Sequence, residues 1–165
     1  MDILPDILDH NLKIIFCGSA PGRTSASTGN YYAHPRNRFW SVLYETGLID
    51  APMKPAQFQD LRQKKYGLTD LCKFTFGNDD DLPQGALMAD RLLEAVKKYQ
   101  PLFLAFTSRN AGRVLCGNRA DYGRQESIGE TRVYVLPTTS PRWGEKWWNS
   151  KKDHWHHFAK TVLSS

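Results

Sequence analysis

Three short apolar segments, each followed at once by turn residues, constrain the fold of this chain more than any other feature. They are Lys13–Cys17, Leu102–Phe106 and Val133–Leu136. Runs of this length and composition are typical of parallel strands that are buried on both faces. Helical patterns accompany them, over Asn37–Thr46, Met88–Tyr99, Ser108–Cys116 and from about Ser150 to Leu163. Alternating strands and helices predict an α/β fold, a three-layer sandwich whose central, mostly parallel sheet has helices on both faces.

The size and charge of the chain narrow the class of protein further. A length of 165 residues suits one domain, so we expect a single domain over residues 1–165. The formal net charge of +5 favours a polyanionic partner. Three scattered cysteines, at Cys17, Cys72 and Cys116, indicate reduced thiols and no disulfide framework. We expect a soluble intracellular protein with no membrane partner, because the acidic N-terminal segment lacks a signal and no apolar run could cross a bilayer.

The first apolar segment leads directly into a glycine-rich turn, Gly18-Ser19-Ala20-Pro21-Gly22. Glycine lets backbone amides approach a ligand closely, because no Cβ stands in the way. In open α/β sheets ligands bind at the carboxyl ends of the strands, where this turn and Pro137–Arg142 both fall. Between them, Asn30–Trp40 mixes flat rings, amides and guanidinium groups, which suits a base together with a phosphate. We therefore expect an active site at this edge of the sheet.

Three motifs in order, Gly18–Gly22, Tyr32–Trp40 and Leu136–Arg142, resemble those of the uracil-DNA glycosylase superfamily. The resemblance is strongest to the mismatch-specific branch that includes thymine-DNA glycosylase, and the outer two motifs are also similar to the hypoxanthine-DNA glycosylase branch. Tyr66–Leu71 fits as well, whereas Cys72–Tyr99 matches only in general character. The resemblance implies a monofunctional, cofactor-free enzyme of base excision repair. Such an enzyme flips a damaged nucleotide out of DNA and hydrolyses its N-glycosidic bond.

The resemblance also implies roles for individual residues. Tyr32 aligns with the aromatic residue that stacks on the flipped base, the alternative being a core tyrosine. Gly18, Ser19 and Asn37 are candidate base contacts, although Asn37 could equally cap the following helix. Arg142 aligns with the residue that enters the vacated stack, the alternative being a phosphate contact. The candidate contacts to DNA phosphates are Arg23, Ser25, Thr138, Thr139 and Ser140.

One departure from the family pattern concerns catalysis. Ala20 stands where the mismatch-specific branch commonly has an asparagine that positions water, and a methyl group cannot do this. We expect Asp70 to replace it, as a general base for water or an electrostatic partner of the cationic sugar. The alternative for Asp70 is an N-cap or a solvated loop residue. Ser19 and Asn37 are further candidates, for positioning or for holding water.

These features predict an enzyme that releases free uracil from DNA, with double-stranded DNA as a partner and single-stranded DNA left open. We expect a cytoplasmic monomer with access to DNA. The lesion range, among uracil, hypoxanthine, xanthine and thymine, stays open. So do two alternatives, a non-catalytic binder of damaged DNA, which Ala20 favours, and an unrelated hydrolase that holds a nucleotide phosphate at Gly18–Gly22. We expect no metal, because neither His154–His157 nor Asp79–Asp81 has the ligand spacing of a metal site.

Overall fold

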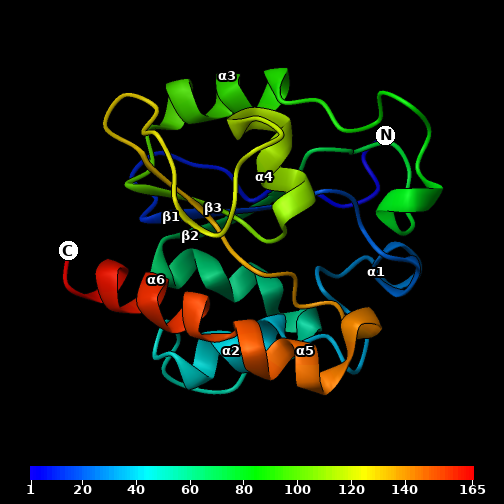
Figure 1. The fold of residues 1–165 in the computed structure, drawn as a ribbon, viewed down its shortest axis with the longest axis horizontal. Coiled ribbons are helices and arrows are strands. Elements are labelled where there is room, and N and C mark those ends of the chain that lie inside the picture. The colour runs from blue at the N-terminus through cyan, green and yellow to red at the C-terminus, as the bar shows by residue number, and fades with distance from the viewer.

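The computed structural model describes residues 1–165, and a five-stranded sheet lies at its centre (Figure 1). The strands are β1 Ile14–Gly18, β2 Tyr66–Asp70, β3 Phe103–Phe106, β4 Gly123–Arg124 and β5 Arg132–Val135. Their order is β2-β1-β3-β5-β4, in which the first four are parallel and β4 runs antiparallel to β5. The predicted α/β fold with a mostly parallel central sheet is confirmed.

Helices cover both faces of this sheet. The α-helices are α1 Arg23–Thr28, α2 Phe39–Glu45, α3 Asp90–Tyr99, α4 Arg109–Cys116, α5 Gly144–Lys151 and α6 Asp153–Leu163, and the 3₁₀ helices are η1 Pro55–Lys64, η2 Asp79–Asp81 and η3 Pro141–Trp143. The helix predicted from Ser150 was wrong at its start. Two helices occupy this region, and α5 was missed because it buries only Trp148 and so lacks an apolar stripe. None of the helices has the length and apolar character needed to cross a membrane.

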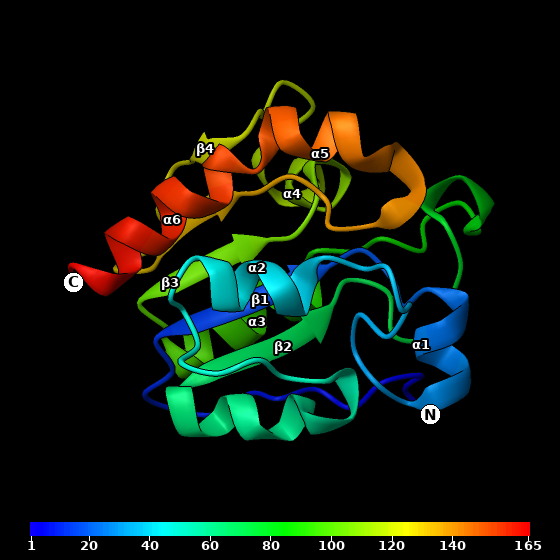
Figure 2. The same cartoon turned by 90° about the horizontal axis from the view of Figure 1, so that it is seen from below.

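Side chains alternate between two hydrophobic cores along β1, β3 and β5. Phe16 points into a core with α2, α5 and α6, the layer that Figure 2 views from its outer side. Cys17, the next residue, points into the second core with α3 and α4. Because both faces are buried, these strands consist of nearly continuous apolar residues. The loops that follow the strands are therefore left to build a site at one edge of the sheet.

Strand β2 was not among the predicted strands, because Gly67 and Thr69 interrupt its apolar pattern. Gly67 is required there, since a Cβ would lie 2.5 Å from the carbonyl oxygen of Ile7, which pairs with β2. The register of β1 and β2 places Gly18 directly opposite Asp70. The last residues of two neighbouring strands thus meet at the carboxyl edge of the sheet.

Candidate active site

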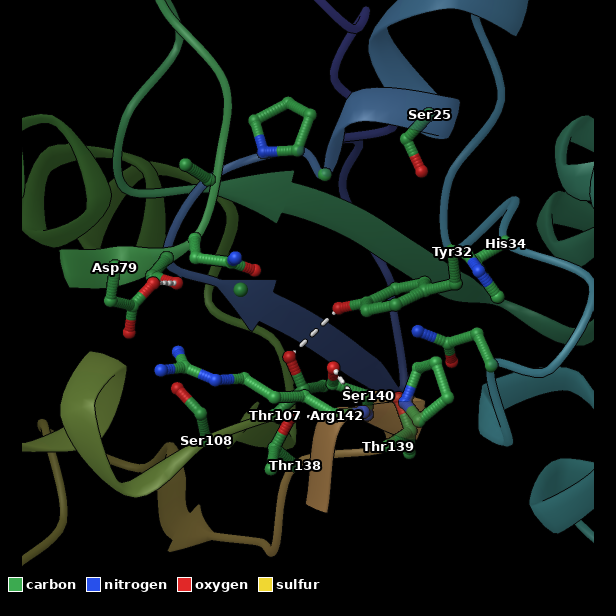
Figure 3. A pocket seen from close by; sticks show the side chains of 18 of the residues that line it. Ser25, Tyr32, His34, Asp79, Thr107, Ser108, Thr138, Thr139, Ser140 and Arg142 are labelled. Carbon is green, nitrogen blue, oxygen red and sulfur yellow. Dashed lines mark hydrogen bonds between the residues drawn. The ribbon is translucent and has the colours of Figure 1, made fainter. Parts of the chain in front are cut away.

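A cavity of about 1050 Å³ opens at the carboxyl edge of the sheet (Figure 3). Most of its lining comes from five parts of the chain: the turn after β1, the loop before α2, η2 with the residues before it, the start of α4 and the loop after β5. All the site residues predicted from the sequence line it, namely Gly18, Ser19, Arg23, Ser25, Tyr32, Asn37, Asp70, Thr138, Thr139, Ser140 and Arg142. The fold therefore brings together residues that are up to 124 positions apart in the sequence (142 − 18).

Asp70 forms the floor of the cavity beside Gly18. Its side chain is buried, and Oδ2 has no hydrogen-bond partner. A Cβ at Gly18 would lie 2.7 Å from Asp70 Oδ1, so the carboxyl group occupies the space that the glycine leaves free. Burial raises the pKa of Asp70 to about 7; among the smaller effects, Lys73 and Arg91 lower this pKa, and the neighbouring carboxylate of Asp6 raises it. Asp70 is thus neither a helix cap nor a solvated loop residue.

A polar network behind the cavity fixes the backbone at Asp70. Asp6 accepts hydrogen bonds from Lys73 Nζ and Thr69 Oγ1, both at 2.7 Å, and from Arg91 Nη1 at 2.6 Å. Arg91 Nη2 also donates to the carbonyl oxygen of Asp70 at 2.7 Å. None of these bonds reaches the Asp70 carboxyl group. The network therefore fixes the backbone at Asp70 and leaves its carboxyl group without a hydrogen-bond partner in the protein.

Tyr32 forms one wall of the cavity and is held on two sides. Its ring stacks on Phe39, with centroids 3.9 Å apart, and its hydroxyl forms a 2.8 Å hydrogen bond with Thr107 Oγ1. Its φ of 51° is a left-handed conformation that costs free energy in a residue with a side chain, and such residues concentrate at functional sites. Its neighbour Tyr31 is the core tyrosine, only 1% exposed, with its hydroxyl bonded to the carbonyl of Pro5.

Asn37, Ser19 and Ser25 place polar groups in the cavity, and these groups differ in the hydrogen bonds that they already form within the protein. Asn37 Oδ1 accepts a hydrogen bond from Phe39 N at 2.9 Å, at the start of α2, which leaves its NH₂ group unpaired. Ser19 Oγ donates to Asp79 Oδ1 at 2.5 Å. Ser25 Oγ accepts from Ala33 N at 3.0 Å, so this buried serine braces the loop that carries Tyr32.

The acidic segment η2 lies at the surface and borders the cavity. Asp79 binds Ser19 and also accepts a hydrogen bond from Asn110 Nδ2 at 3.1 Å. Asp80 Oδ2 lies 3.0 Å from Arg142 Nη2, and both side chains are largely exposed. These surface aspartates pair with polar groups of three other segments, namely the turn after β1, α4 and η3. In the free protein, Arg142 is therefore held on the η2 side of the cavity, as Figure 3 shows.

The loop after β5 uses its own polar groups to fold. Thr138 Oγ1 accepts from Ser140 N at 3.2 Å, and Ser140 Oγ accepts from Arg142 N at 3.3 Å. Thr139 is buried, and its carbonyl accepts from Arg38 N at 3.0 Å. These bonds shape a compact loop that carries Arg142 at the mouth of the cavity.

Thr107 is a cavity residue that the sequence analysis missed. It follows β3 directly, is buried, and holds the hydroxyl of Tyr32. A signal was available, because the rule that placed Gly18 at the end of a parallel strand applies equally to the residue after Phe106. With Gly18 and Asp70, it completes a row of strand-end residues under the cavity.

Two comparisons with known proteins agree with this geometry. A family model described as the Uracil DNA glycosylase superfamily matches residues 5–162. The solution NMR structure of a "putative Uracil DNA glycosylase" from Methanosarcina acetivorans is similar, with a TM-score of 0.67. The two chains are 20% identical, and the match covers 97% of this chain and 96% of the other. At this identity the structural likeness establishes a shared fold.

Proposed function

The chain belongs to the uracil-DNA glycosylase superfamily, and we propose that it is a monofunctional glycosylase that flips uracil out of DNA and hydrolyses its N-glycosidic bond. Membership of this superfamily supports DNA glycosylase activity. Uracil as the substrate and assignment to the mismatch-specific branch are our proposal. One observation carries it: the buried Asp70 carboxyl group, with Oδ2 unpaired, lines a cavity large enough for a flipped nucleotide.

In the proposed reaction the C1′–N bond breaks and its electron pair leaves with the base. The sugar then carries positive charge, and a water oxygen attacks C1′. The ionised Asp70 carboxylate orients this water, stabilises the cationic sugar and takes up the proton that the water loses. The ring of Tyr32 stacks on the base, and the free NH₂ group of Asn37 donates to a carbonyl oxygen of the base or holds the water.

The mouth of the cavity supplies the contacts to DNA. The ion pair between Arg142 and Asp80 breaks when DNA binds, and the Arg142 side chain then enters the base stack as the nucleotide leaves it. Backbone and hydroxyl groups of Thr138, Thr139 and Ser140 bind neighbouring phosphates, as does Arg23 at the start of α1. Ser25 contributes indirectly, because its hydroxyl holds the loop that carries Tyr32.

A second candidate is a non-catalytic binder of damaged DNA, which Ala20 favours because it cannot position water. A single-turnover assay separates the two, with uracil-containing oligonucleotides as substrate and strand cleavage at abasic sites as readout. We expect cleavage, and parallel oligonucleotides with hypoxanthine, xanthine and thymine define the lesion range. Lesion binding without base release would favour the binder. Hydrolysis of free nucleotides without DNA binding would contradict both.

Replacing Tyr32 with alanine should weaken binding of uracil-containing DNA by about 1–3 kcal/mol, and binding of undamaged duplex much less. The ring is available to a base only after the base has left the helix. Tyr32→Phe should be mild, because Thr107 Oγ1 keeps a second partner in the carbonyl of Cys17. Fluorescence anisotropy with both duplexes measures the difference. An equal loss of affinity for the two duplexes would mean that Tyr32 acts only through packing within the protein.

Replacing Arg142 with alanine should slow excision most from well-paired duplex, less from mismatched duplex and least from single strands. The cost of unpairing the target falls in that order, and the inserted guanidinium offsets it. Single-turnover rates on the three substrates test this. A phosphate contact would instead weaken all three equally and reduce the salt dependence of binding by about one counterion.

A further inference from the structure

A tryptophan at the rim of the cavity has no part in the proposed chemistry. Trp143 directly follows Arg142 and is 52% exposed, in contrast to the buried Trp148 and Trp155 nearby. Trp143 belongs to neither hydrophobic core, whereas Trp147, one turn later, packs against the larger one. Both rings line the cavity, with centroids 5.9 Å apart and planes at 35°. The fold therefore does not require a large aromatic side chain at position 143.

Two flat groups meet at this point of the rim. The guanidinium carbon of Arg142 lies 5.3 Å from the ring centroid of Trp143, and Nη2 of the same group lies 3.0 Å from Asp80 Oδ2. Indole rings and guanidinium planes both stack on nucleobases. The adjoining hydroxyl-rich loop and the net charge of +5 suit the phosphates that accompany a base. This surface has the chemistry of a single-stranded nucleotide site.

We propose that Trp143, with Arg142, forms a stacking site for an unpaired nucleobase next to the nucleotide held in the cavity. The position of this site next to a flipped nucleotide rests on the proposed function. Its ligand is single-stranded DNA of any sequence, because every base has a π-face that can stack on the indole ring. A paired duplex hides the faces of its bases. The site consequently binds DNA only where bases are unstacked.

The test uses the full chain and undamaged DNA, so that it does not depend on catalysis. Trp143→Ala should weaken binding of a single-stranded oligonucleotide roughly 5- to 150-fold at fixed salt, the range expected for one lost base stack. Binding of the fully paired duplex of the same sequence should change little, and Trp143→Phe should retain most of the affinity. The quenching of tryptophan fluorescence by the oligonucleotide should fall in Trp143→Phe. Tyr44→Ala is the matched control, because Tyr44 is 47% exposed on α2 and does not line the cavity.

Unchanged single-strand affinity in Trp143→Ala would overturn the proposal. Equal losses on single strand and paired duplex would also overturn it, since they indicate a backbone contact or another partner for this face. An oligomer of abasic sugar phosphates should bind Trp143→Ala and wild type alike. Base release from uracil-containing duplex is measured separately. If wild type releases no base while Trp143→Ala loses single-strand affinity, the proposed function fails and the stacking site stands.

Discussion

Replacing Asp70 with asparagine should lower the single-turnover rate of base release roughly 10²- to 10⁴-fold, the usual loss when a general base is removed. The amide has nearly the same shape but cannot accept a proton from water. Lesion binding should remain, because the side chain forms no hydrogen bond that holds the cavity together. Asp60→Asn, at an exposed aspartate of η1, is the matched control. A full rate in Asp70→Asn would remove Asp70 from the mechanism.

The same substitution should stabilise the protein above pH 7. The pKa of Asp70 is about 7 in the folded protein and about 3.9 in an unfolded chain. Between these values the unfolded state releases its proton first, so this group's contribution to the free energy of unfolding falls as pH rises. The full difference corresponds to on the order of 4 kcal/mol at pH 8 relative to pH 3. Denaturant unfolding of wild type and Asp70→Asn at several pH values measures it.

The activity of the wild type should show the opposite trend. Only the carboxylate accepts a proton, so the rate should rise with pH through about 7 and level off above it. The rise should be absent from the residual activity of Asp70→Asn. A wild-type rate that is flat between pH 5 and 9 would contradict the role of Asp70 as general base.

Replacing Gly18 with alanine should reduce base release by at least about 10²-fold, the loss that a displacement near 1 Å can cause in an active site. The new Cβ would lie 2.7 Å from Asp70 Oδ1, 3.3 Å from Tyr32 Oη and 3.4 Å from Thr107 Oγ1. One methyl group thus crowds the proposed base and the proposed stacking residue together. Single-turnover rates and lesion affinity should both fall.

Gly22→Ala is the matched control for this prediction. Gly22 belongs to the same turn and lines the same cavity, but its φ is −73° and a Cβ there would meet nothing within 4 Å. Activity should therefore stay close to wild type. Comparable losses in both variants would mean that flexibility of the turn matters, and that crowding at Asp70 does not.

The sequence predicted those parts of the fold and the cavity that depend on a local pattern of residues. The apolar segments ending at Cys17, Phe106 and Leu136 predicted three strands, and the turns after the outer two predicted two walls of the cavity. Contacts between residues that are distant in sequence could not be predicted in this way. Asp6 lies near Arg91 because the N-terminal segment pairs with β2 at Ile7 and Leu68, and no periodicity of the sequence predicts that pairing.

The acidic segment shows a second limit of sequence patterns. Consecutive aspartates indicate exposure, and Asp80 is exposed, but the pattern does not reveal that Asp79 and Asp80 bind groups in the turn after β1, in α4 and in η3. Trp143 was missed for the converse reason. A tryptophan usually indicates a core, and only the folded chain reveals that this one lies at the rim.

The pairing of Gly18 with Asp70 across β1 and β2 also constrains how this pocket can diverge during evolution. The carboxyl group of Asp70 occupies the space beside Gly18, so position 18 cannot gain a side chain freely while Asp70 stays the same. A lineage that gains a side chain at position 18 must shorten or lose the residue at position 70, and with it the proposed base. The two positions are therefore expected to covary among descendants of this chain, and a new lesion preference is reached more readily through the loop residues around them.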